Sequence, residues 1–142
     1  MKVIQISIFL ENTGGRIAEA TSILADAGIN IRAMSLADTT DFGVLRLIVS
    51  DVDKAEKALK DQGFAVGKTN VVAVQVEDKP GGLNRILQVL AKAEINVEYI
   101  YAFLRDSDQA IMIFRFDNTD NALKILQENK IKVFKGEDIY AM

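Results

Sequence analysis

The chain has 142 residues, of which 49% are hydrophobic and 26% charged, a composition typical of a globular protein. Its formal net charge of −3 offers no basic surface for the phosphates of a nucleic acid, so we expect no nucleic-acid partner. The absence of cysteine and histidine excludes disulfides, thiolate and imidazole catalysis and zinc sites of the Cys/His type. We therefore expect neither a metal nor a cofactor.

The spacing of apolar residues changes several times along the first half of the chain. Residues 3–10 alternate between apolar and polar, which predicts a strand. This segment does not resemble a signal peptide. From Arg16 apolar residues recur every three or four positions until Gly28, which suits a left-handed helix stop. The predicted order is strand, helix, strand, strand, helix, strand, at 3–10, 16–27, 29–37, 44–49, 54–62 and 64–66.

The second half repeats the first. Residues 10–31 align without a gap with residues 76–97, and seven of the 22 pairs are identical. Chance would give roughly one or two. The same element order is predicted at 69–76, 82–93, 95–104, 110–116, 120–129 and 131–134, with one extra residue expected in the 105–108 turn. The chain is therefore expected to be an internal duplication.

Each βαββαβ copy carries two helices with a single apolar stripe. This predicts an α+β fold of two ferredoxin-like units in tandem, with antiparallel sheets and the helices on one face. We predict the domains at residues 1–67 and 68–142, joined without a flexible linker. No run approaches the ~20 apolar residues of a membrane helix, so a cytoplasmic protein without a membrane partner is expected.

A pair of glycines precedes the first helix of each copy, Gly14–Gly15 and Gly81–Gly82. Glycines before a helix leave backbone N–H groups accessible, and the helix dipole favours an anion such as a carboxylate there. The alternative is that the glycines only turn the chain from strand to helix. The glycines by themselves do not decide between the two.

The pattern D/N-x-P-G-x-L, followed by a helix that ends A-x-x-G/E-I-N-I/V, resembles the ACT domain. The strongest match is residues 78–83 with 93–97, and the likeness covers essentially the whole chain in two copies. The resemblance implies a regulatory protein that binds an amino acid or a related small molecule between paired domains. It also implies a homodimer or higher homo-oligomer and a partner enzyme under its control.

The first copy is similar to the serine-binding ACT domain of 3-phosphoglycerate dehydrogenase. That likeness makes Asn12 and Asn30 the best ligand candidates, with the second asparagine supplied by the facing domain. The alternative for Asn30 is a turn asparagine bonded to its own backbone. The full set that the resemblance assigns to ligand binding is Asn12, Thr13, Gly14, Gly15, Asn30 and Ile31 in the first copy, and Asp78, Lys79, Pro80, Gly81, Gly82, Leu83, Asn96 and Val97 in the second.

Four departures from the family pattern indicate that the two loops are not equivalent. Gly14 replaces the proline, Arg16 follows the glycines, Asp78 replaces an asparagine, and Glu94 replaces the glycine at the helix end. A glutamate at a helix stop is expected to be strained or to alter the shape of the turn. We expect the first loop to be the serine-like site.

The sheets are predicted to be apolar on both faces. Residues expected to meet the helices in the first copy are Ile6, Ile8, Met34, Leu36, Leu45 and Leu47; those expected on the opposite face of the second are Val71, Ala73, Tyr99, Tyr101, Phe103, Ile111, Ile113 and Arg115. Such a surface is too apolar to face water, which predicts a cover by another sheet or a partner chain. The alternative is that the faces are assigned the wrong way round.

An enzyme is not expected, because the densest acids lie in predicted turns and a helix cap, where solvated acids are common. The strands also lack the basic aromatic motif of an RNA-binding RRM. The remaining alternative to a ligand sensor is a structural or oligomerisation module of the same fold without a ligand.

Overall fold

The fold is seen in a computed structural model, which describes residues 1–11, 13–38, 41–103 and 109–142. Its elements are β1 (Val3–Glu11), α1 (Arg16–Asp26), β2 (Ile31–Asp38), β3 (Phe42–Val49), α2 (Val52–Asp61), β4 (Ala65–Glu77), α3 (Gly82–Lys92), β5 (Val97–Phe103), β6 (Gln109–Phe116), α4 (Thr119–Glu128), β7 (Val133–Phe134) and α5 (Gly136–Ala141). They form two compact units. The N-terminal unit comprises Ile4–Thr69 with Tyr140–Met142, and the C-terminal unit comprises Asn70–Ile139 with Met1–Val3.

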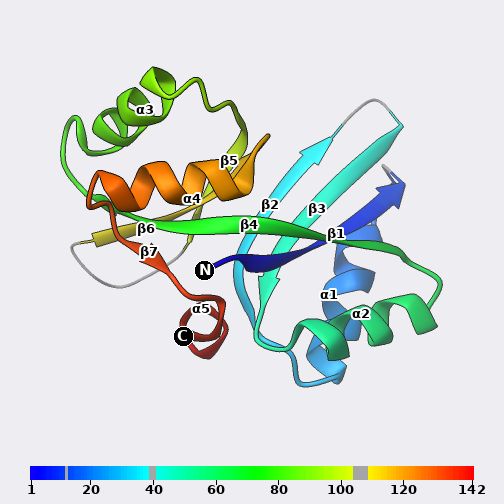
Figure 1. The fold of residues 1–142 in the computed structure, drawn as a ribbon. Helices are drawn as coiled ribbons and strands as arrows, with labels where there is room; N and C mark the ends of the chain where they lie inside the picture. Colours follow the sequence, from blue (N-terminus) through cyan, green and yellow to red (C-terminus); the bar gives the residue numbers. More distant parts are fainter. Residues whose placement is uncertain (12, 39–40, 104–108) are drawn as a thin grey trace. The chain divides into compact units, whose positions relative to one another are not determined.

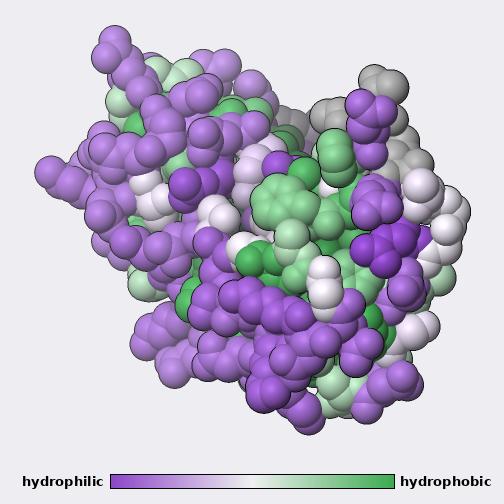
Figure 2. Space-filling view, turned by 90° about the vertical axis from the view of Figure 1, so that its right-hand side faces the viewer, coloured by the Kyte–Doolittle hydropathy of each residue, from purple (hydrophilic) through white to green (hydrophobic). Residues whose placement is uncertain are grey.

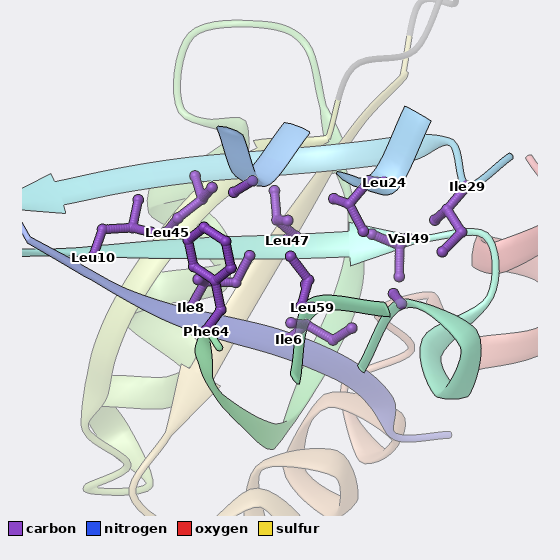
Figure 3. Packing of buried hydrophobic residues seen from close by; sticks show 12 residues of the cluster. Ile6, Ile8, Leu10, Leu24, Ile29, Leu45, Leu47, Val49, Leu59 and Phe64 are labelled. Carbon is purple, nitrogen blue, oxygen red and sulfur yellow. The ribbon is translucent and has the colours of Figure 1, made fainter. Parts of the chain in front are cut away.

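In the N-terminal unit the strands follow the order β2-β3-β1-β4, with antiparallel pairing of β1 and β2 to β3. Helices α1 and α2 lie on one face of this sheet (Figure 1). Apolar side chains from β1, β3 and both helices point toward one another between the two layers (Figure 3). Alternation in the strands and the three- to four-residue stripe of α1 together produce this core.

The C-terminal unit has the same arrangement, with β7-β4-β6-β5 as its strand order and α3 and α4 packed on one face (Figure 1). Its core contains Val72, Val74 and the stacked rings of Phe114 and Phe116, whose centroids lie 5.4 Å apart. The predicted fold class, two ferredoxin-like βαββαβ units with helices on one face, is confirmed.

Three details differ from the sequence prediction. The strands expected at 64–66 and 69–76 form one continuous strand, β4, because Gly67 keeps an extended conformation and does not turn the chain. The short helix α5 was not predicted, since six residues carry too little periodicity to recognise. The extra residue expected within 105–108 lies outside the described residues. The domain boundary at residue 67 stays a prediction.

The face assignment holds for β1 and β3, and the register places Met34 and Leu36 of β2 on the same face, but these two residues are not buried. Ile6, Ile8, Leu45 and Leu47 are fully buried in the helix-facing core. Met34 and Leu36 pair with Leu47 and Leu45, yet they are 45% and 52% exposed. Because β2 stands at the edge of its sheet, these side chains extend beyond that core.

The residues predicted on the opposite face of the C-terminal unit lie outside its helix-facing cluster. Val71, Ala73, Ile111 and Ile113 are nevertheless fully buried, while Tyr101 and Phe103 are nearly so. The faces were therefore not assigned the wrong way round. On the face that Figure 2 draws, apolar residues also reach the surface among hydrophilic ones.

The helix ends differ between the copies in residue type but not in conformation. Gly28 and Gly63 end the helices of the first copy with φ of 73° and 85°. Glu94 and Lys130 occupy the matching positions with φ of 57° and 58°. Glu94 therefore keeps the shape of the turn and is strained, which was one of the two expected outcomes. No helix in the described part of the chain is long and apolar enough to cross a membrane.

Candidate functional site

The loop between β1 and α1 opens onto a cavity of about 420 Å³. Thr13 and Gly15 come from the predicted ligand loop, and Arg16 begins the helix. The cavity is lined by Leu10, Glu11, Thr13, Gly15, Arg16, Ile17, Ala18, Leu36, Asp38 and Gly43. Its volume lies within the range of small-molecule sites, which is about 300–1,000 Å³.

Strand register explains why distant residues meet here. In the antiparallel pairing Gly43 lies opposite Leu10 on β1 and opposite Asp38 on β2. Three strand ends are thereby placed beside the start of α1. Sequence reasoning did not identify Leu36, Asp38 or Gly43, because register between strands leaves no local signal in a single sequence.

Helix α1 begins without a side-chain cap. Gly15 occupies the cap position in the left-handed region, with φ of 86°, and has no side chain that could bond the first N–H groups. This geometry needs glycine, and it leaves the helix end with the donors and the dipole that attract a carboxylate. Gly14 has open space around it and does not line the cavity.

Arg16 provides the cationic group of the cavity. Its Nη1 donates to Oε2 of Glu19 at 2.8 Å, and its guanidinium carbon lies 4.3 Å from the centre of the Phe64 ring. Its Nε is buried and has no hydrogen-bond partner among the described residues. Two contacts thus hold the guanidinium in place while one of its donors stays unpaired.

The matching loop of the second copy is tighter. The N–H of Gly82 donates to the carbonyl of Lys79 at 3.0 Å, and a Cβ on Gly82 would run into the carbonyl of Glu77. Lys79 also pairs with Glu77 at 2.8 Å, which lowers the pKa of the Glu77 carboxyl below its ordinary value. Asp78, Pro80 and Gly81 are exposed, whereas Leu83 packs against the core.

The asparagines after the first helix of each copy lie apart from these loops. Asn30 follows the other end of α1, a helix of 11 residues that is about 16 Å long at 1.5 Å per residue, and it does not line the cavity. Its backbone N–H donates to Oγ of Ser50 at 3.0 Å, and its side chain bonds to no other described residue. Within one unit, therefore, Asn30 does not meet the cavity.

Asn96 repeats this arrangement, with its N–H donating to Oδ1 of Asp117 at 3.1 Å. The neighbouring residues Ile31 and Val97 pack against the helix-facing cores and do not line the cavity. Asn12 lies outside the described residues. The predicted pairing of Asn12 with an asparagine from a facing domain stays a prediction.

Comparison with known proteins identifies the family of the duplicated fold. The whole chain, residues 1–142, matches the family described as an ACT domain pair. This chain belongs to that family. The ACT domain is a regulatory domain and not a catalytic one.

Solved structures show the same pair. Protein BT0572 from Bacteroides thetaiotaomicron is 42% identical, with a TM-score of 0.95 over 100% of this chain and 98% of that one. The regulatory subunit of aspartate kinase from Thermus thermophilus is 19% identical, with a TM-score of 0.61 over 88% and 91% of the two chains. The one from Thermus flavus is 17% identical, with a TM-score of 0.61 over 88% and 90%. The two kinase subunits share the fold. No curated protein matches this ACT pair.

Proposed function

We propose that this ACT domain pair is a regulatory protein without catalytic activity that binds an amino acid in the cavity beside α1. The observation that carries the proposal is that the predicted glycine loop opens onto a cavity of about 420 Å³. An uncapped helix start and an arginine with an unpaired donor line that cavity. Both features suit a carboxylate.

A ligand can control a partner enzyme by changing how much of the protein is in each of two arrangements. A ligand that binds one arrangement of the protein more tightly than another shifts the equilibrium toward the first. The protein would pass this shift to the enzyme with which it associates. Regulatory subunits of aspartate kinase share this fold, which supports a regulatory role for this chain. The likeness does not specify the partner enzyme.

A thermal-shift screen of the twenty amino acids tests the proposal. We expect a saturable rise in Tm for one compound or for one chemical group of compounds, because a ligand that binds only the folded state stabilises it. Replacing Asn12 by alanine is expected to abolish a response to serine. A response to serine that Asn12→Ala leaves unchanged would remove that residue from the site.

The second candidate is a structural or oligomerisation module that associates without a ligand. Exposed apolar residues favour it, since Phe9, Met34 and Leu36 are between 45% and 53% exposed in the N-terminal unit. A flat screen together with a mass that rises with concentration would select this candidate. We also infer a cytoplasmic location, which cell fractionation can test.

A further inference from the structure

We propose that the cavity beside α1 selects an α-amino acid with an apolar side chain, and that Arg16 binds its carboxylate. The proposal rests on the proposed function and adds the chemistry of the ligand. It differs from the serine-like site expected from the sequence. Three features of the cavity carry it: the arginine, the apolar wall and the two acids at the rim.

The arginine is held in place but incompletely bonded. Glu19 accepts one hydrogen bond from Nη1 at 2.8 Å, and the ring of Phe64 lies under the guanidinium at 4.3 Å. The buried Nε has no partner among the described residues, and a buried donor without an acceptor destabilises the protein. The Arg16 side chain lines the cavity and is 27% exposed, so a carboxylate that enters beside it can accept hydrogen bonds from the exposed part of the guanidinium.

Part of the cavity wall is apolar. Leu10 and Ile17 come from β1 and α1, and Leu36 comes from the edge strand β2. Leu36 is 52% exposed, so an apolar group that covers it removes hydrocarbon surface from water. The volume of about 420 Å³ leaves room for a side chain larger than the hydroxymethyl group of serine.

Glu11 and Asp38 complete the site with negative charge. Both line the cavity, and both carry exposed side chains at strand ends. Carboxylates accept hydrogen bonds and attract a cation, so they suit the ammonium group of an amino acid. One cation, two anions and an apolar wall together match a zwitterion with a hydrocarbon side chain.

The second copy lacks these features, which predicts one ligand per chain. Gly82 stands where the first copy has Arg16, and a Cβ there would meet the carbonyl of Glu77. The nearby cation, Lys79, is already paired with Glu77 at 2.8 Å. The position that carries the guanidinium in the first copy therefore has no side chain here and no room for one.

Isothermal titration calorimetry on the full chain tests the proposal. The probes are the twenty amino acids and two analogues of leucine: 3-methylbutylamine, which lacks the carboxylate, and 4-methylpentanoate, which lacks the ammonium. If another apolar amino acid binds more tightly, its own analogue pair replaces these two. The proteins are wild type, Arg16→Met, which keeps the packing over Phe64, and the control Arg85→Met on α3.

We expect an apolar amino acid to bind at one per chain, more tightly than serine, and each analogue to bind at least about tenfold more weakly. Arg16→Met should weaken the binding of the amino acid by about tenfold or more. It should leave the binding of the amine unchanged, because the amine has no carboxylate for Arg16 to bind. Arg85→Met should change neither.

Two outcomes overturn the proposal while leaving the proposed function intact. One is tighter binding of serine or another polar amino acid. The other is that Arg16→Met weakens the binding of the amino acid and of the amine equally, which would show that the arginine only shapes the cavity. If none of the twenty amino acids binds, the proposed function fails as well.

Discussion

At the scale of single residues, the second copy carries backbone strain that the first copy avoids. Glu94 and Lys130 have φ of 57° and 58° where the first copy has glycine. The left-handed conformation costs a residue with a Cβ roughly 1–2 kcal/mol, and part of this is offset because glycine adds entropy to the unfolded chain.

Glu94→Gly is therefore expected to raise the free energy of unfolding by about 0.5–1 kcal/mol, as measured by urea denaturation. Gly28→Ala is the matched change in the opposite direction and should lower it by about 1 kcal/mol. A Glu94→Gly protein that unfolds at lower urea concentration than wild type would show that the strain account is wrong.

A second prediction at this scale concerns the pair of Lys79 and Glu77. The hydrogen bond and the charge of Lys79 lower the pKa of the Glu77 carboxyl below its ordinary value of 4.5. The pair therefore stabilises the folded state above pH 4.5, and this contribution is lost as the pH falls through the lowered pKa. Both side chains are exposed, so the effect on stability is small.

Carboxyl NMR titration measures this directly. Lys79→Met should return the pKa of Glu77 toward 4.5. Lys124→Met removes a different exposed cation, the partner of Glu128, and should leave Glu77 unchanged. A Glu77 titration that is identical in wild type and Lys79→Met would contradict the assignment.

At the scale of elements, the start of α3 depends on close backbone approach. Gly82 is buried and its Cα faces the carbonyl of Glu77 at the end of β4. Gly82→Ala should destabilise the protein by about 1–3 kcal/mol in thermal or urea unfolding, because the new methyl group forces the two segments apart. Gly14→Ala is the control: it has open space and should change stability by less than about 0.5 kcal/mol.

The tyrosine of the short helix α5 belongs to the N-terminal unit and is hydrogen-bonded within it. The hydroxyl of Tyr140 accepts a hydrogen bond from the N–H of Ile4 at 2.7 Å, and its carbonyl accepts one from Nε of Arg32 at 3.1 Å. Tyr140→Phe should lower the free energy of unfolding by about 0.5–1.5 kcal/mol and speed hydrogen exchange at the Ile4 amide. Met142→Ala, at an exposed neighbouring position, should do neither.

At the scale of the whole molecule, we expect self-association. Light scattering should give a mass of at least twice the 15.7 kDa of one chain. Phe9 is 53% exposed on β1, and Phe9→Lys should shift the protein toward monomer by placing a charge on an apolar surface. Ser22→Lys, on the exposed side of α1, should not. A wild-type protein that stays monomeric at high concentration would contradict both the homodimer and the structural-module candidate.

The duplication, the order of the elements and the helix stop at Gly28 could all be predicted from the sequence. The duplication shows in the alignment of residues 10–31 with residues 76–97. The elements and the helix stop depend on residues close together in the sequence: the alternation in β1, the stripe in α1, and a glycine suited to positive φ. The glycine loops could be predicted for the same reason. For Glu94, comparing the two copies left two outcomes, strain or a different turn, and the structure decided for strain.

Only the tertiary structure decided which loop opens onto a cavity and which residues complete it. Leu36 and Asp38 reach the start of α1 through the pairing of β2 with β3, and the exposure of Leu36 follows from the position of β2 at the sheet edge. Pairing between strands and the packing of a helix start against them depend on residues far apart in the chain. Local patterns in one sequence do not encode those distances.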